Sequence, residues 1–127
     1  MDDPNLLHPF DELVRPLNGM RVSRAWNGYG SAICLDLGEL HEEPAGNRSS
    51  LCGEAAILIQ WDWRAEFKAG VVVGSSSSRK SIKQFLERLE GRRINSVSLD
   101  DIGPELRIQF SNGIVIRSMV MHRADPQ

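Results

Sequence analysis

The segment EAAILIQWDWRAEF, residues 54–67, carries the strongest structural signal in the chain. Every second residue in it is apolar, and this set is Ala55, Ile57, Ile59, Trp61, Trp63, Ala65 and Phe67. The intervening positions are mostly polar. Alternation with a period of two predicts a strand with one covered and one mostly wet face, which is typical of an antiparallel sheet. We therefore expect one long antiparallel strand here.

Shorter segments with the composition of strands flank this one on both sides. They are Met20 to Trp26 and residues 33–37, 71–73, 94–99, 106–110 and 114–121. Within residues 94–99 the alternation is broken by one residue, which predicts a bulge. Asn112-Gly113 predicts a type I′ hairpin turn, because that turn requires positive φ at both central residues. From Gly38 to Gly53 the chain is polar, and we expect a loop without regular elements.

One long helix is predicted over Arg79–Glu90. Ser77 or Ser78 is the expected N-cap, and Gly91 stands where a C-cap glycine is favoured. The apolar positions form one stripe, so the helix should cover a sheet face through Ile82, Phe85, Leu86 and Leu89, with Trp61 and Trp63 as partners for Phe85. A shorter helix should begin at Pro9 and end at Pro16.

These elements predict the α+β fold class: a single antiparallel curled sheet of about six or seven strands packed on one main helix, with a short N-terminal helix. The 127 residues should form a single domain, 1–127, with an N-terminal arm or short helix at 1–17, a core at 18–122 and a tail at 123–127. A chain of this length and apolar content needs neither a metal nor a disulfide to fold.

The charge and the cysteines limit the partners and the compartment. The formal net charge is −2, which favours neither a nucleic-acid nor a membrane partner. The first 66 residues carry 11 acidic and 5 basic residues, whereas the last 61 carry 6 and 10, a split that can give a dipolar surface. Cys34 and Cys52 form no CxxC pair, and no apolar run is long enough to span a membrane. We expect a cytoplasmic protein with reduced thiols and no cofactor.

The segment GSSSSRKS, residues 74–81, comes closest to a chemical motif. It matches the phosphate loop GxxxxGK[ST] except that Arg79 occupies the second glycine position, where a side chain strains the turn. A weaker form of the hypothesis is an anion site made by Ser77, Ser78, Arg79 and Lys80 at the helix start. The alternative is a serine-rich cap and linker.

Other polar groups suggest chemistry less strongly. His41-Glu42-Glu43 are adjacent in the sequence, with no second ligand cluster, so we predict no metal site. No nucleophile, base and orienting group can be assembled, and we assign no catalytic residues. Glu54, Asp62 and Glu66 are the wet side of a strand or a recognition surface. The basic residues of the helix lack interleaved aromatic residues, which argues against nucleic-acid binding.

Trp26 and Tyr29 flank a glycine-containing turn, Trp26-Asn27-Gly28-Tyr29-Gly30. Large aromatic side chains beside glycines are common in contact surfaces, because they supply apolar area at a low cost in conformational entropy. We predict that both residues bind a partner. The alternative is that Trp26 ends a strand inside the core and that Tyr29 covers it.

The order of elements, with VVVGS at 71–75, LEG at 89–91 and LRIQFSNGI at 106–114, resembles small uncharacterised bacterial α+β proteins, some of them immunity proteins or companions of toxin systems. The resemblance implies a protein partner, with a toxin as one candidate, and no catalytic residues. We expect a non-enzymatic protein-binding module of immunity-like or accessory type, and a homodimer stays open because long strands leave an edge to cover. The alternative is a small anion- or ligand-binding domain, or an unrecognised small enzyme, centred on Ser75–Ser81.

Overall fold

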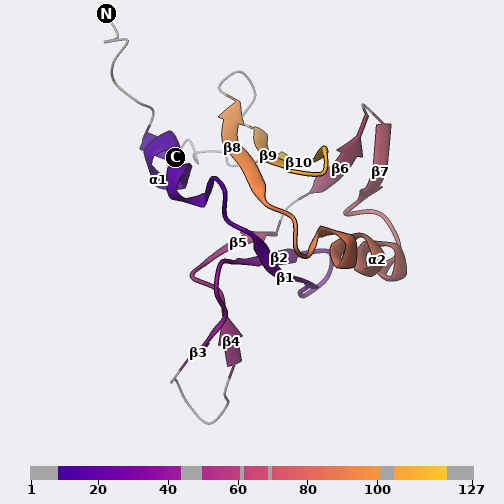
Figure 1. Ribbon diagram of the computed structural model, residues 1–127. Helices are drawn as coiled ribbons and strands as arrows, with labels where there is room; N and C mark the ends of the chain where they lie inside the picture. Colours follow the sequence, from indigo (N-terminus) through magenta and orange to yellow (C-terminus); the bar gives the residue numbers. More distant parts are fainter. Residues whose placement is uncertain (1–8, 44–49, 61, 69, 101–104, 120–127) are drawn as a thin grey trace, which may run out of the picture.

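The computed structural model describes residues 9–43, 50–60, 62–68, 70–100 and 105–119. This part of the chain is mostly β: ten strands, all paired antiparallel, and two short α-helices (Figure 1). The strands form a three-stranded sheet, a five-stranded sheet and a separate two-stranded hairpin. The predicted antiparallel pairing is therefore confirmed, but the predicted α+β class and its single sheet are wrong, because strands in separate sheets make up most of the described residues and the helices are short.

The three-stranded sheet has the order β1-β2-β5, with β1 at Val22–Asn27, β2 at Ile33–Leu37 and β5 at Ala55–Ile59. Its central strand is apolar on the inner face, where Leu35 lies opposite Ala25 on one side and Ile57 on the other. Every side chain of β2 is buried. This sheet therefore forms one wall of the hydrophobic core.

The five-stranded sheet forms the second wall, in the order β7-β6-β10-β9-β8. These strands are β6 (Trp63–Phe67), β7 (Gly70–Gly74), β8 (Ile94–Asp100), β9 (Glu105–Phe110) and β10 (Ile114–Met119). The pairing of β8 with β9 shifts register between Ile94 and Ser96, which confirms the predicted bulge. Ile108 and Ile116 lie opposite each other and are fully buried.

The prediction of a single sheet on one main helix is wrong because the long strand is divided. Its first part, β5, pairs with β2, and its second part, β6, pairs with β10 and β7. At the break the Ser118 hydroxyl donates a 3.0 Å hydrogen bond to the Asp62 carbonyl. Ile59 and Trp63 are both buried, so the alternation keeps its phase across the break and predicts the buried side correctly. Trp61 lies outside the described residues.

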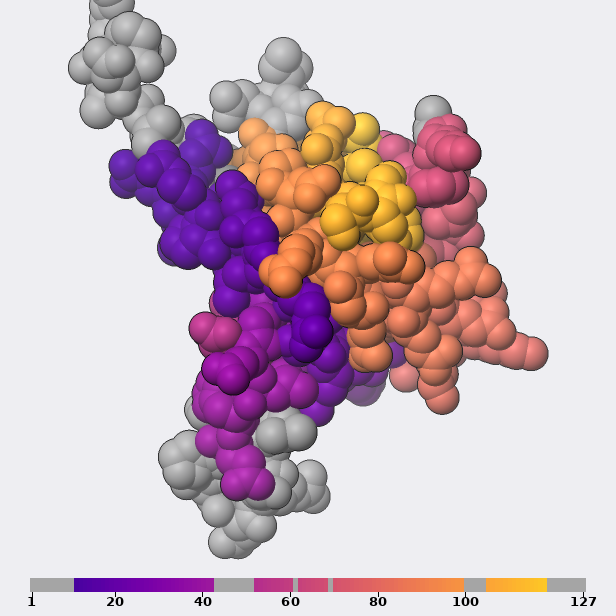
Figure 2. Space-filling model, in the orientation of Figure 1, coloured from indigo at the N-terminus to yellow at the C-terminus, as the bar shows by residue number. Residues whose placement is uncertain are grey.

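The predicted loop from Gly38 to Gly53 is also corrected. It contains two short strands, β3 (His41–Glu43) and β4 (Ser50–Cys52), which pair with each other and extend away from the body as an arm (Figures 1 and 2). Strands of three residues are too short to show an alternation that sequence analysis can detect.

The helices match their predicted positions. α1 spans Pro9–Val14 and continues as a 3-10 turn, η1, at Arg15–Leu17. α2 spans Arg79–Leu89, and its four predicted apolar residues are all buried. The Phe85 ring stacks on Trp63 with the centroids 6.1 Å apart. α2 contacts both β1 and β7, so it lies across the junction of the two sheets and does not cover one face.

The turn between β9 and β10 differs in type from the prediction. Gly113 has a positive φ of 89°, but among the described non-glycine residues only Lys68 does, so Asn112 is not in the left-handed region. The Gly113 N–H donates to the Phe110 carbonyl at 3.0 Å. This is the three-residue loop in which a type I turn is followed by a left-handed glycine, which also connects strands tightly.

A short pairing joins the two sheets at their adjacent edges. Residues 19–22 run beside residues 91–94, and Gly91 and Ile94 donate backbone hydrogen bonds to Val22 and Met20 at 2.7 and 2.9 Å. An isolated antiparallel bridge links Arg21 with Arg93 in the same place. The end of α2 is thereby fixed against the start of β1, which positions the site described below.

Candidate functional site

Trp26 and Tyr29, the two predicted partner-binding residues, lie on the surface. Trp26 is 42% exposed near the end of β1, and Tyr29 is 100% exposed in the turn that follows. The alternative, in which Trp26 closes the core from inside, does not hold. Two large aromatic side chains are therefore available to solvent at one end of the three-stranded sheet.

Asp36 holds the Trp26 ring in place. This aspartate lies on the outer face of β2 but is only 5% exposed. Its carboxylate accepts a 3.2 Å hydrogen bond from the indole N–H and a 3.1 Å hydrogen bond from Arg24, and a longer one of 3.4 Å from the Gly53 backbone. The Arg24 guanidinium lies 5.7 Å from the centroid of the Trp26 ring. Trp26 is thus a fixed aromatic platform.

Tyr29 lies on a turn that is tied to α2. Within the turn, the Gly28 N–H donates to the Ala32 carbonyl at 2.8 Å, and the Asn27 amide donates to the same oxygen at 2.7 Å. From outside, Arg79 at the start of α2 donates a 2.8 Å hydrogen bond to the Gly30 carbonyl. Residues 49 positions apart in sequence are thereby held together.

A shallow depression of about 590 Å³ lies between β1 and α2. It is lined by Ala25, Trp26, Asn27, Arg79, Lys80, Lys83, Leu86, Glu87 and Glu90. Trp26 from the predicted aromatic pair and two cations of the predicted anion site, Arg79 and Lys80, therefore meet at one place, while Tyr29 lies outside the depression. Within the described part of the chain, neither Lys80 nor Lys83 forms an ion pair, and the Glu90 carboxylate is engaged by the Ala25 N–H at 2.9 Å.

We name the set Trp26, Tyr29, Arg79, Lys80 and Lys83 the basic aromatic patch. Arg79 is joined to the Tyr29 turn through the Gly30 carbonyl, and Lys80 and Lys83 line the depression together with Trp26. Glu87 and Glu90 lie further toward the C-terminal end of α2. Tryptophan, tyrosine and arginine are the residue types most enriched at the energetic centres of protein interfaces, and the patch contains one of each.

The serine segment serves the fold. The Ser78 hydroxyl accepts a 3.1 Å hydrogen bond from the Ser81 N–H, which confirms it as the N-cap of α2. The Ser77 hydroxyl accepts one of 3.0 Å from the Gly74 N–H. Neither serine lines the depression, whereas Arg79 and Lys80 do. The structure therefore divides the predicted anion site. Ser77 and Ser78 form hydrogen bonds at the start of α2, whereas Arg79 and Lys80 belong to the patch.

The other basic residues of the helix do not continue the patch. Arg88 and Arg92 line a different cleft, on the far side of α2. Arg93 donates a 2.8 Å hydrogen bond to the Gly19 carbonyl, between the two sheets. What the sequence shows as one basic ridge is divided between three places.

The acidic residues of the long segment do not converge. Glu54 accepts a 2.6 Å hydrogen bond from the Glu39 N–H, and Asp62 accepts a 3.5 Å hydrogen bond from the Ser75 hydroxyl. Glu66 belongs to a network on the outer face of the five-stranded sheet, whose other members are Arg64, Glu105 and Arg117. Hydrogen bonds from Arg64 and Arg117 lower the pKa of Glu66, so it stays a carboxylate. This suits a structural ion pair better than a general base.

The Cys34 thiol is not activated. Burial raises the pKa of the Cys34 thiol, and the nearby Asp36 carboxylate adds to the effect, so the thiol stays protonated. Cys52 is half-buried at the end of β4. Among the described residues, no group of three or more His, Cys, Asp or Glu side chains could hold a metal ion. His41, Glu42 and Glu43 form the strand β3.

Comparison of the chain with models of protein families, with curated proteins and with solved structures finds no match in any of the three. None of the helices in the described residues is long and apolar enough to cross a membrane.

Sequence analysis missed two residues: Lys83, which belongs to the patch, and Asp36, which holds Trp26 in place. Lys83 is one of six basic residues in and after the helix, and nothing in its spacing sets it apart. Asp36 has a clearer signal, because a carboxylate between two leucines in an apolar strand must be either exposed or paired. That signal could have identified the residue that holds Trp26.

Proposed function

We propose that the protein is a non-enzymatic binding module that recognises an acidic protein surface through the basic aromatic patch. The observation that carries the proposal is the fixed Trp26 ring beside three cations, of which Lys80 and Lys83 have no ion pair in the described chain. A bound partner would present a carboxylate to the lysines and an apolar group to the ring. A neutralising or accessory role toward a bacterial protein is one use of such a module.

The distribution of charge along the chain supports this proposal. Residues 22–59 carry two basic and five acidic residues, a net charge of −3, and residues 63–119 carry ten and six, a net charge of +4. Each sheet is built from one of these segments, so the two charges are not mixed by strand pairing. The three cations of the patch lie on α2, which belongs to the basic segment 63–119. An acidic partner would be steered there, with an association rate that falls as salt is added.

The test uses two synthetic peptides of equal length, one of alternating Glu and Phe and one of alternating Lys and Phe. Binding is followed through the Trp26 indole N–H and the amides of Lys80 and Lys83 in ¹H–¹⁵N spectra. We expect saturable shifts at these positions with the acidic peptide and none with the basic one. Lys83→Glu should abolish them.

Arg88→Glu is the matched control, because it makes the same change of charge on the opposite side of the same helix. If it weakens binding as much as Lys83→Glu does, only the net charge is being sensed. Equal shifts with both peptides would also contradict the proposal.

A further inference from the structure

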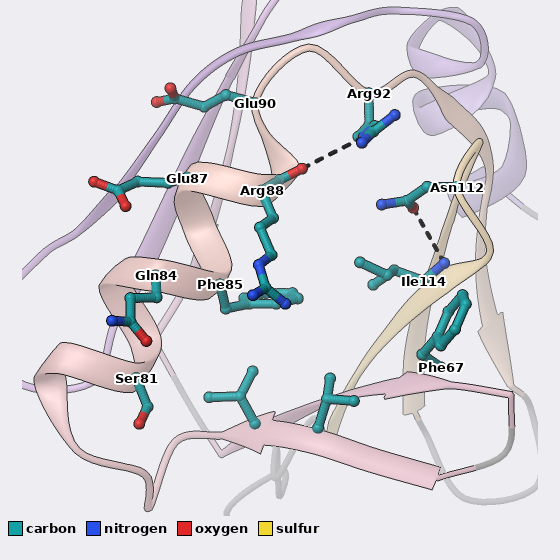
Figure 3. A pocket seen from close by; sticks show the side chains of 12 residues that line it. Phe67, Ser81, Gln84, Phe85, Glu87, Arg88, Glu90, Arg92, Asn112 and Ile114 are labelled. Atoms are coloured by element: carbon teal, nitrogen blue, oxygen red, sulfur yellow. Dashed lines mark hydrogen bonds between the residues drawn. The ribbon is translucent and has the colours of Figure 1, made fainter.

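A second cleft lies on the other side of α2, away from the patch. It has a volume of about 640 Å³ and is bounded by α2, the β6–β7 hairpin and the turn between β9 and β10 (Figure 3). This volume falls in the range of sites for small organic ligands. The proposed function uses the basic aromatic patch and not this cleft, so a ligand could bind in the cleft whether or not the patch binds a protein.

One part of the cleft is apolar. It is lined by Phe67, Val72, Val73, Phe85 and Ile114, which come from four different elements. Phe67 and Val72 are 41% and 56% exposed, so both leave apolar surface in contact with water. The pairing of β6 with β7 shifts register between Ala65 and Glu66, which leaves Val72 without a partner residue on β6. Phe67 and Val72 thus both contribute exposed apolar surface to the cleft.

The polar part of the cleft is cationic. Figure 3 shows the Arg88 side chain extending from α2 into the cleft, while Glu87 and Glu90 point away from it. In the described part of the chain, neither Arg88 nor Arg92 has a carboxylate partner. The Arg92 side chain donates a 3.4 Å hydrogen bond to the Arg88 carbonyl, which holds it at the rim.

Asn112 supplies a neutral donor at the opposite side. Its side-chain oxygen accepts a 3.2 Å hydrogen bond from the Ile114 N–H, which directs the amide nitrogen toward the cleft (Figure 3). The Asn112 amide nitrogen and the Arg88 guanidinium thus enter the cleft from opposite sides (Figure 3). A cation and a neutral donor around an apolar floor are the groups that recognise a carboxylate attached to an apolar body.

We propose that this cleft binds a small organic carboxylate with an aromatic or branched apolar body. The carboxylate accepts charge-assisted hydrogen bonds from Arg88, and the apolar body covers Phe67, Val72 and Phe85. Glu87 and Glu90 also line the cleft, but their carboxylates point away from the Arg88 guanidinium (Figure 3), and neither forms an ion pair with it in the described part of the chain. The ligand must carry both a carboxylate and an apolar body. The arginines are exposed to water, so they bind a carboxylate alone only weakly, and the apolar floor alone does not fix the orientation of a ligand.

The test compares 4-phenylbutyrate with its neutral analogue 4-phenylbutanamide, and with inorganic phosphate as an anion without an apolar body. Chemical shifts are followed at Val72, Phe85, Arg88 and Asn112. We expect 4-phenylbutyrate to bind with an affinity of roughly millimolar order, as its small size allows, and the amide to bind at least about tenfold more weakly. Phosphate should cause no saturable shift at Val72 or Phe85.

Arg88→Gln should weaken the binding of 4-phenylbutyrate to the level of the amide. The side chain of Arg88 is exposed, so this variant should fold, and a far-UV circular dichroism spectrum checks that it does. Arg15→Gln removes an exposed cation of η1 that lines neither the cleft nor the patch, so it is the matched control and should leave the affinity unchanged. Equal binding of acid and amide, an affinity unaffected by Arg88→Gln, or no saturable shift with 4-phenylbutyrate would each overturn the proposal.

Discussion

Replacing Asp36 with alanine should destabilise the protein by about 3 kcal/mol. The variant leaves the Trp26 indole N–H and the Gly53 N–H without their carboxylate acceptor, 3.2 and 3.4 Å away in the native protein. Hydrogen bonds to a charged acceptor contribute roughly 1.5 kcal/mol each when they are as long as these. The ion pair with Arg24, whose side chain is 40% exposed, adds less than about 1 kcal/mol because solvent screens it.

Urea denaturation followed by circular dichroism measures this loss. For a domain of this size the dependence of the unfolding free energy on urea is roughly 1.5 kcal/mol per molar, so the midpoint should fall by about 2 M. Asp36→Asn keeps an acceptor oxygen for the indole and should lose about half as much. The emission of Trp26 should also change in Asp36→Ala, because the ring is no longer held.

Glu42→Ala is the control, since this carboxylate is exposed on β3 and forms no hydrogen bond within the described residues. Surface substitutions of this kind change stability by less than about 0.5 kcal/mol. A loss in Asp36→Ala no greater than that of the control would refute the reasoning, because it would mean that the three contacts of Asp36 contribute nothing.

Three other outcomes follow from the structure. Hydrogen bonds from two arginines lower the pKa of Glu66 below its ordinary value of 4.5, so the Glu66 carboxylate stabilises the fold above that pH. This stabilisation is lost as the pH falls through the folded-state pKa. In urea titrations the difference in unfolding free energy between the native protein and Glu66→Gln should therefore shrink in acid. Gly53→Ala should cost more than about 2 kcal/mol in thermal or urea unfolding, since the added Cβ would lie 2.6 Å from the backbone N and O of Leu37. Cys52 should react with a thiol reagent well before Cys34, whose buried thiol has a raised pKa; equal rates in the native protein would contradict this.

The local features that are predicted correctly have signals that lie within a few residues of one another. The limits of α2, its Ser78 cap and its buried stripe all follow from helical spacing. The buried side of the segment from Glu54 to Phe67 follows from alternation. The change of sheet within that segment does not, because Ile59 and Trp63 are four residues apart and a period of two passes through the break unchanged.

The candidate site was predicted in parts. Trp26, Tyr29, Arg79 and Lys80 were identified separately, for different reasons, from two distant segments of the chain. Their meeting depends on the packing of α2 against β1, and no short-range pattern contains that contact. The hydroxyls of Ser77 and Ser78 were interpreted as ligands, but a helix start uses such groups to satisfy its own N–H donors.

The division of the strands between the sheets has a consequence for the integrity of the chain. All pairings of β1 to β5 lie within residues 22–59, and all pairings of β6 to β10 lie within residues 63–119. A protease that cut the backbone between Ile59 and Trp63 would therefore cut within no strand and separate no pair of hydrogen-bonded strands. The two pieces would still be joined by the bridge between residues 19–22 and 91–94 and by the contact of α2 with β1. A nicked molecule would therefore keep both halves together, and separately expressed halves would have a defined surface on which to reassemble.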